Sequence, residues 1–145
     1  MSGAPAAPAR ESAYADTNII VALLSGSTHA SHAEALDLFR RVAFGELILL
    51  VPSVVVAELT YVLGRGAGWS RADLVGRLRA MFDTVGIELV ERAAIARALD
   101  LYEGHGRLDF ADAYIGAMAL EQGPATVASF DHDFDLIDGV RRIAA

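Results

Sequence analysis

Residues 46–51 read Glu-Leu-Ile-Leu-Leu-Val and are followed at once by Pro52; this stretch decides the fold class. An almost continuous apolar run of this length is typical of a strand that is buried on both faces of a parallel sheet. Pro52 ends the run, because proline has no backbone N–H to donate to a neighbouring strand. We therefore expect a sheet whose two faces are both covered.

Segments of strand-like and helix-like character alternate on both sides of this run. Further strands are expected to end near residues 14–16 and to lie at residues 87–90, 125–129 and 140–143. Helices are expected at about residues 32–44, 53–63, 71–82, 93–102 and 109–122, with Ser53 and Ser70 as capping residues. This alternation predicts an α/β domain with a parallel sheet.

Composition narrows the class of protein. The chain has 145 residues, of which 54% are hydrophobic and 21% charged, and this excludes an intrinsically disordered chain. It contains no cysteine, so disulfides, thiolate zinc sites and a cysteine nucleophile are excluded. No apolar run approaches the ~20 residues of a membrane span. We expect a flexible tail at residues 1–12, one domain at 13–145 and a cytoplasmic protein without a membrane partner.

The charge balance argues mildly against a nucleic-acid partner, because the formal net charge is −7. A metal ion bound to an acidic site would change the local sign. The densest basic stretch contains Arg65, Arg71, Arg77 and Arg79, with Trp69 inside it as a candidate stacking platform for RNA bases. An ordinary solvated helix face is the favoured interpretation of this stretch.

Acidic side chains follow the predicted strands where a functional crevice is expected, beyond the carboxyl ends of the sheet. Asp16 follows the first strand, and Asp109 and Asp112 begin the helix that precedes the 125–129 strand. Asp131 and Asp133 come shortly after that strand. These acids are far apart in the sequence, yet the topology predicts that they lie near one another.

Glu58 stands within a predicted helix whose neighbouring positions are apolar, with Val54 and Val55 before it and Tyr61 and Val62 after it. A carboxylate that faces a core is costly unless it is paired or bound to a metal. The alternative is a two-sided helix from whose edge Glu58 reaches solvent.

Each of the other acids also has an ordinary structural interpretation. Asp109 could cap its helix and Asp112 could interact with the helix dipole, while Asp16 could form an Asx turn. Taken together, however, acids that converge on one cleft with almost no basic residue beside them would repel one another. Mg²⁺ or Mn²⁺ would relieve that repulsion, and two such ions can cleave a phosphodiester.

Other sites fit the sequence poorly. Asp131, Asp133 and Asp135 have the spacing of a calcium loop, but Leu136 and Arg142 occupy the positions that need Gly and Glu. His29 and His32 have no further soft ligands beside them and are assigned to no metal. Fingerprints of P-loop, Rossmann and GxSxG proteins are absent from the sequence.

Four segments together resemble a PIN-domain ribonuclease, specifically a VapC-type toxin of a type II toxin–antitoxin system. They are Tyr14–Asn18 (YADTN), Val56–Leu59 (VAEL), Asp109–Ala117 (DFADAYIGA) and Ser129–Phe134 (SFDHDF), in the order and at separations similar to those of the family. The resemblance spans about residues 13 to 143.

This resemblance implies a three-layer α/β/α sandwich with a central parallel sheet and Mg²⁺- or Mn²⁺-dependent endonucleolytic cleavage of RNA. It implies four catalytic acids, Asp16, Glu58, Asp112 and Asp131, with Asp109 and Asp133 as additional metal ligands. Thr17, Asn18 and Ser129 match polar residues that orient carboxylates or water. The resemblance also implies a homodimer and a cognate antitoxin protein.

Two alternative functions remain open at the level of sequence. The first is a PIN-like binding module without catalysis, which the net charge of −7 would suit. The second is another Mg²⁺-dependent phosphoryl-transfer enzyme. The lack of any lysine counts against a phospho-accepting receiver domain, and Asn18 departs from the Asp-x-Asp of a haloacid dehalogenase-type phosphatase.

Overall fold

The computed structural model describes residue 3 and residues 10–144. Most of the tail predicted at residues 1–12 lies outside the described residues, and the first strand begins at Glu11. The strands are β1 (Glu11–Tyr14), β2 (Leu47–Val51), β3 (Ile87–Leu89), β4 (Thr126–Ala128) and β5 (Arg141–Ile143). The helices are α1 (Thr17–Leu24), α2 (His32–Ala43), α3 (Ser53–Leu59), α4 (Arg71–Phe82), α5 (Arg92–Gly104) and α6 (Phe110–Gln122), with a π-helix, η1 (Thr60–Gly66), and a 3₁₀ helix, η2 (His132–Leu136).

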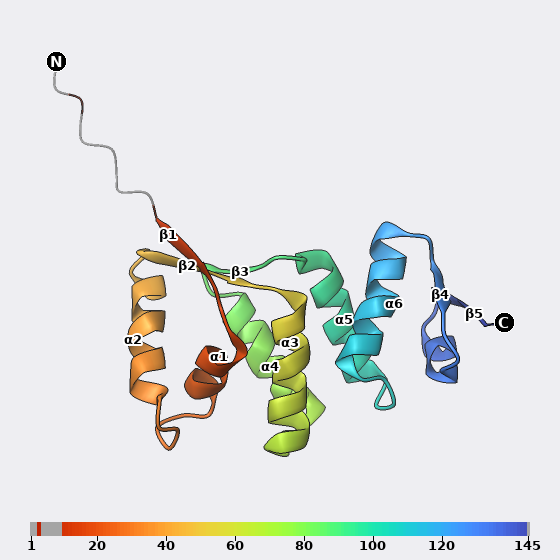
Figure 1. The fold of residues 1–145 in the computed structure, drawn as a ribbon, viewed down its shortest axis with the longest axis horizontal. Coiled ribbons are helices and arrows are strands. Elements are labelled where there is room, and N and C mark those ends of the chain that lie inside the picture. Colours follow the sequence, from red (N-terminus) through yellow and green to blue (C-terminus); the bar gives the residue numbers. More distant parts are fainter. Residues whose placement is uncertain (1–2, 4–9, 145) are drawn as a thin grey trace.

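The apolar run at residues 47–51 is the middle strand of a parallel sheet, as its composition predicts. Strand order is β1-β2-β3, with Glu11 opposite Leu47 and Leu49 opposite Ile87. Along β2, fully buried residues alternate with partly buried ones, so neither face of the strand is open to solvent. Figure 1 shows α1, α2, α3 and α4 gathered beside this sheet.

The last two strands form a second parallel pair, β4-β5, rather than joining the first sheet. Figure 1 shows α5 and α6 between the two sheets. The pair has its own small apolar cluster, made of the buried residues Leu108, Val127, Phe134 and Ile137. The α/β class and the parallel strands are thus confirmed, and the expected single sheet is divided into two parallel sheets.

Capping explains where two of the helices begin. Ser70 caps α4 as expected, since its hydroxyl oxygen accepts a hydrogen bond from the Asp73 N–H at 3.1 Å. The prediction that Ser53 caps α3 is wrong. Ser53 is the first helical residue, Pro52 precedes it in extended conformation, and the Ser53 N–H donates to the Glu91 carboxylate at 3.1 Å. The Glu91 carboxylate, which is distant in sequence, therefore accepts a hydrogen bond from the start of α3 in place of the serine hydroxyl.

Among the described residues, no helix combines the length and the apolar character that crossing a membrane requires.

Close packing at Gly116 joins α6 to the second apolar cluster. A Cβ atom on Gly116 would lie 2.5 Å from Ile137 Cδ1, and Ile137 is itself only 2% exposed. Gly76 in α4 offers a contrast, because a Cβ atom there would meet nothing within 4 Å. Glycine at position 116 thus leaves room for Ile137 Cδ1 against α6, and any larger side chain would have to displace it.

We expect Gly116→Val to lower the free energy of unfolding by about 1–3 kcal/mol, because the added methyl groups overpack the contact with Ile137. Gly76→Val, the matched control on an open helix surface, should leave stability unchanged or slightly higher. Urea unfolding of both variants measures the effect. Equal stabilities would contradict the close contact.

Candidate active site

The turn from β1 into α1 places Asp16 and Thr17 at the carboxyl end of the first sheet. Asp16 is exposed and caps α1, with its Oδ1 atom accepting a hydrogen bond from the Thr17 N–H at 2.7 Å. This matches the structural interpretation of Asp16 as a turn residue. Asp16 keeps a second carboxylate oxygen for other partners.

Thr17 connects this turn to α3. Its side chain is buried, and its Oγ1 atom donates to Glu58 Oε2 at 2.5 Å across 41 positions of sequence. A hydrogen bond to a charged acceptor is among the stronger ones in proteins. Thr17 therefore holds the Glu58 carboxylate near Asp16.

Glu58 does not face the core. It is exposed, although its neighbours Val55, Val56 and Leu59 are buried. The helix is two-sided, and the alternative interpretation of an edge position that reaches solvent is the one the structure shows. Apolar flanking residues were a misleading signal, because Val54, Tyr61 and Val62 are themselves exposed.

A cleft of about 610 Å³ lies beside Glu58 and extends to the start of α6. Glu58 and Asp109 line it together, so the structure brings these two predicted site residues to one cavity. The rest of the wall includes aromatic and arginine side chains, namely Tyr61, Trp69, Tyr102, Phe110, Arg65 and Arg71. A cavity of this size is sufficient for a small organic group.

A second group of acids surrounds Asp112 on the first turn of α6. Burial raises the pKa of Asp112, and the negative charges of Asp131, Asp109 and Asp133 raise it further, in that order. Acids from α6 and from the segment after β4 therefore lie close enough to repel one another. The predicted proximity of these segments is present in the structure.

Local turns fix Asp131 and Asp133. Ser129 Oγ accepts a hydrogen bond from the Asp131 N–H at 2.9 Å, and Asp131 Oδ1 accepts one from the Asp133 N–H at 2.9 Å. Asp131 therefore caps η2. Ser129 thus holds the backbone of Asp131, and its role in orienting a carboxylate or water stays a prediction.

Two arginines stand beside the acids, contrary to the expectation that almost no basic residue would do so. Arg65 Nη2 lies 2.9 Å from Asp109 Oδ1, and Arg107 Nε lies 3.5 Å from Asp133 Oδ1. Asp109 thus uses its carboxylate for an ion pair, and it accepts no capping hydrogen bond from the described part of α6. Both pairs are exposed enough for solvent to weaken them.

Two sets of contacts involve the predicted acids: Thr17 bonds to both Asp16 and Glu58, and Asp109, Asp131 and Asp133 lie near Asp112. Within residues 10–144 and residue 3, no three acidic or histidine side chains lie close enough together to share a metal ion. The donor set nevertheless suits Mg²⁺ or Mn²⁺, because it consists of carboxylate oxygens that repel one another. The full six-residue metal set remains a prediction.

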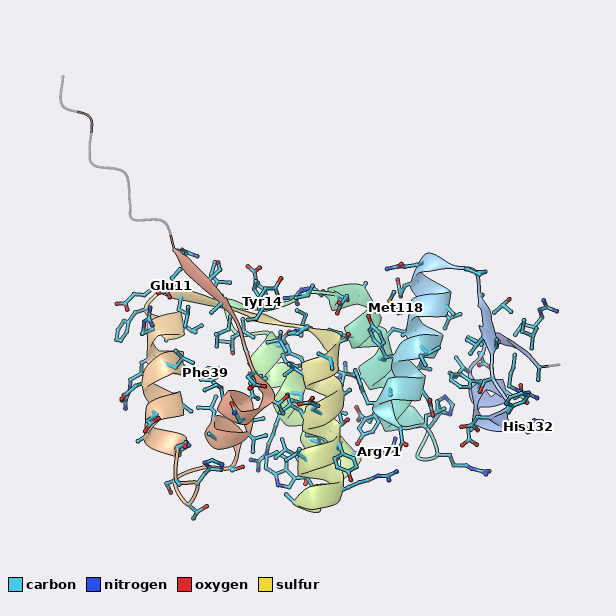
Figure 2. The ribbon with its side chains drawn as sticks, in the orientation of Figure 1. Glu11, Tyr14, Phe39, Arg71, Met118 and His132 are labelled. Atoms are coloured by element: carbon cyan, nitrogen blue, oxygen red, sulfur yellow. The ribbon has the colours of Figure 1, made fainter. Side chains whose placement is uncertain are left out.

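The sequence did not indicate the partners of the arginines between residues 65 and 79. The stretch from Arg65 to Arg79 is not one solvated face: Arg65 pairs with Asp109, Arg79 pairs with Asp100 at 2.6 Å, and Arg77 stacks 4.6 Å from the Trp69 ring centroid. Arg71 reaches the chain between α5 and α6 (Figure 2). Spacing within the stretch carries no signal for these partners, because all of the acceptors lie on other elements.

The link between Thr17 and Glu58 can be measured with a double-mutant cycle. Thr17→Val and Glu58→Ala should show a coupling of about 1 kcal/mol in urea unfolding, since each change removes the same hydrogen bond. Thr17→Val combined with Glu88→Ala is the control, and its coupling should be near zero. Coupling near zero in both pairs would contradict the contact.

The crowding of Asp112 predicts a pH-dependent stability. Because the pKa of Asp112 is raised above its ordinary 3.8, stability falls as pH rises from that value through the folded-state pKa. Without divalent ions, Asp112→Asn should melt a few degrees above wild type at pH 7, and the gap should close below pH 3.8. Thermal melts across pH test this. Asp100→Asn, which removes an ion pair, should give no gain at pH 7.

Comparison with known proteins identifies the family to which this chain belongs. The model of the PIN domain matches residues 13–140, which is most of the chain. A crystal structure of VapBC2 from Rickettsia felis bound to a DNA fragment from their promoter covers 92% of this chain and 98% of that chain, at 16% identity and a TM-score of 0.36. No curated protein matches. On the strength of the family match, the chain belongs to the PIN domain family.

Proposed function

We propose that this protein is a Mg²⁺- or Mn²⁺-dependent endoribonuclease that acts as the toxin of a VapC-type toxin–antitoxin pair in the cytoplasm. Membership of the PIN domain family supports a nuclease. The observation that carries the proposal is the crowding of Asp109, Asp131 and Asp133 around Asp112, with Asp109 and Glu58 in one cleft. Crowded carboxylates favour a bound cation.

In this proposal the catalytic acids are Asp16, Glu58, Asp112 and Asp131, and Asp109 and Asp133 add metal-binding oxygens. A divalent cation, when bound, supplies an activated water and stabilises negative charge on the phosphate. Thr17 holds the Glu58 carboxylate in place through its 2.5 Å hydrogen bond. Ser129 holds the backbone of Asp131 in its turn.

The net charge of −7 argues against an RNA partner, but two arginines lie beside the acidic residues of the site. Arg65 and Arg107 lie at 2.9 and 3.5 Å from Asp109 and Asp133, and their side chains are 68% and 80% exposed. They supply positive charge next to the site, where an RNA phosphate would arrive. Local charge, rather than the net charge of the chain, decides whether RNA can approach.

A cognate antitoxin completes the proposal as the partner that keeps the nuclease inactive, with a homodimer as the working assembly. Val54, Tyr61 and Val62 are 62%, 66% and 39% exposed, and all three line the cleft beside Glu58. Exposed apolar residues grouped at a cleft are typical of a surface that a protein partner covers. An antitoxin segment seated there would block access to Glu58.

Cleavage of RNA by the purified protein tests the function directly. We expect cleavage with Mn²⁺ or Mg²⁺ and none with EDTA, and a loss of about 100-fold or more in Asp16→Asn and Asp112→Asn. Asp100→Asn is the matched control, because Asp100 pairs with Arg79 in an exposed position, and it should cleave like wild type.

Retained cleavage in both Asp16→Asn and Asp112→Asn would overturn the assignment of the site. Tight Mn²⁺-independent binding of RNA, without cleavage under any condition, would instead favour a binding module. Labelling by a small phosphodonor would point to another phosphoryl-transfer enzyme.

A further inference from the structure

We infer that Arg71 is a positioning residue for the proposed nuclease: it clamps the loop between α5 and α6 and thereby sets the direction from which Asp109 and Asp112 enter the site. The inference rests on the proposed function for its catalytic consequence. Its structural part, a clamp on residues 105–108, stands on contacts of the described residues alone.

Arg71 is the first residue of α4 and is partly buried. Its Nη1 atom donates to three backbone carbonyl oxygens, those of Tyr102 at 2.8 Å, His105 at 3.3 Å and Leu108 at 2.5 Å. Figure 2 labels Arg71 on the lower side of the view, the side on which α5 connects to α6. One guanidinium group therefore joins the last turn of α5 to the residue just before Asp109.

The chemistry of a helix end explains why an arginine suits this place. The last carbonyl groups of a helix have no partner within the helix, and they carry the negative end of its dipole. The Arg71 guanidinium satisfies the Tyr102 carbonyl and lies 4.0 Å from the centroid of the Tyr102 ring. A planar guanidinium can donate these hydrogen bonds while stacking on the ring, whereas a lysine ammonium has no planar face to stack.

The position of the Leu108 carbonyl matters most for the site. Leu108 is completely buried, and the next residue, Asp109, precedes α6 directly. With the Leu108 side chain held in the second apolar cluster and its carbonyl held by Arg71, the start of α6 has little freedom. Asp112 lies on the first turn of that helix, so the position of its carboxyl group is restricted in the same way.

Arg71 differs in this respect from the arginines around it. Arg65 and Arg79 are paired with carboxylates, whereas the recorded partners of Arg71 among the described residues are carbonyl oxygens and an aromatic ring. Its charge is not used to neutralise an acid in the described part of the chain. Removal of Arg71 would therefore alter the path of the loop rather than free a catalytic carboxylate.

The test compares Arg71→Gln, Arg71→Lys and wild type, with Arg77→Gln as the matched control from the same helix. In the metal-free protein, amide hydrogen exchange should become faster in residues 105–113 of Arg71→Gln and stay unchanged elsewhere. Mn²⁺ affinity should fall about 10-fold, as for other supports of metal ligands. With RNA, kcat should fall more than KM changes. Arg71→Lys should recover part of each effect, and Arg77→Gln should match wild type.

A merely structural role would lower the melting temperature of Arg71→Gln but leave Mn²⁺ affinity and kcat of the folded variant like those of wild type, and this result would overturn the inference. Should Arg71→Gln fail to fold, Arg71→Lys answers the same questions, and wild-type values in all three readouts would count against the clamp. Hydrogen exchange needs neither metal nor RNA. Failure of wild type to bind Mn²⁺ or cleave RNA would overturn the proposed function, while unchanged exchange at 105–113 would overturn the clamp.

Discussion

Repulsion between carboxylates is the constraint on which the arrangement of this protein depends. Asp109, Asp131 and Asp133 surround Asp112, whose pKa is raised first by burial and then by their negative charges. Something other than the acids must therefore hold these segments together. Apolar packing does so on the side away from the site, where Leu108, Phe134 and Ile137 are buried beneath the segments that carry Asp109, Asp131 and Asp133.

Glycine at position 116 contributes to the apolar packing that holds the acid-bearing segments together. It lets Ile137 approach the helix α6 closely, so the η2 region packs onto the helix that carries Asp112. Buried apolar contacts are non-directional and tolerate nearby charge, provided that the charged groups themselves remain in contact with water. Asp109 and Asp131 are exposed to solvent. Buried apolar side chains therefore hold the segments together while water solvates these carboxylates, and this explains how the acids can be neighbours.

The sequence contains no lysine, so its 12 permanently charged basic side chains are all arginines, and the structure uses their planar group in several ways. Arg65 and Arg107 each pair with one carboxylate at the site, and Arg71 donates hydrogen bonds to backbone carbonyl oxygens. Arg142 holds the second sheet to η2 by contacting Asp135 at 3.1 Å and the Ser129 carbonyl at 3.0 Å, and its hydrogen bond lowers the pKa of Asp135. Several donors in a fixed fork suit these positions better than one mobile ammonium group.

The sequence by itself determined most of the strands and longer helices and the family, but it did not indicate the helix α1 at Thr17–Leu24 or η2 at His132–Leu136. Residues 47–51 formed the predicted buried strand, Ser70 capped α4, and the four acid-bearing segments indicated a PIN domain, because periodicity, caps and motifs are properties of nearby residues. Tertiary structure alone decided that Glu58 is exposed and bonded to Thr17, that Glu91 replaces Ser53 at α3, and that the strands divide into two sheets. It also gave Arg65 and Arg71 their partners. Each of these contacts joins residues distant along the chain, and the neighbours of a side chain across such distances depend on how whole elements pack rather than on local pattern.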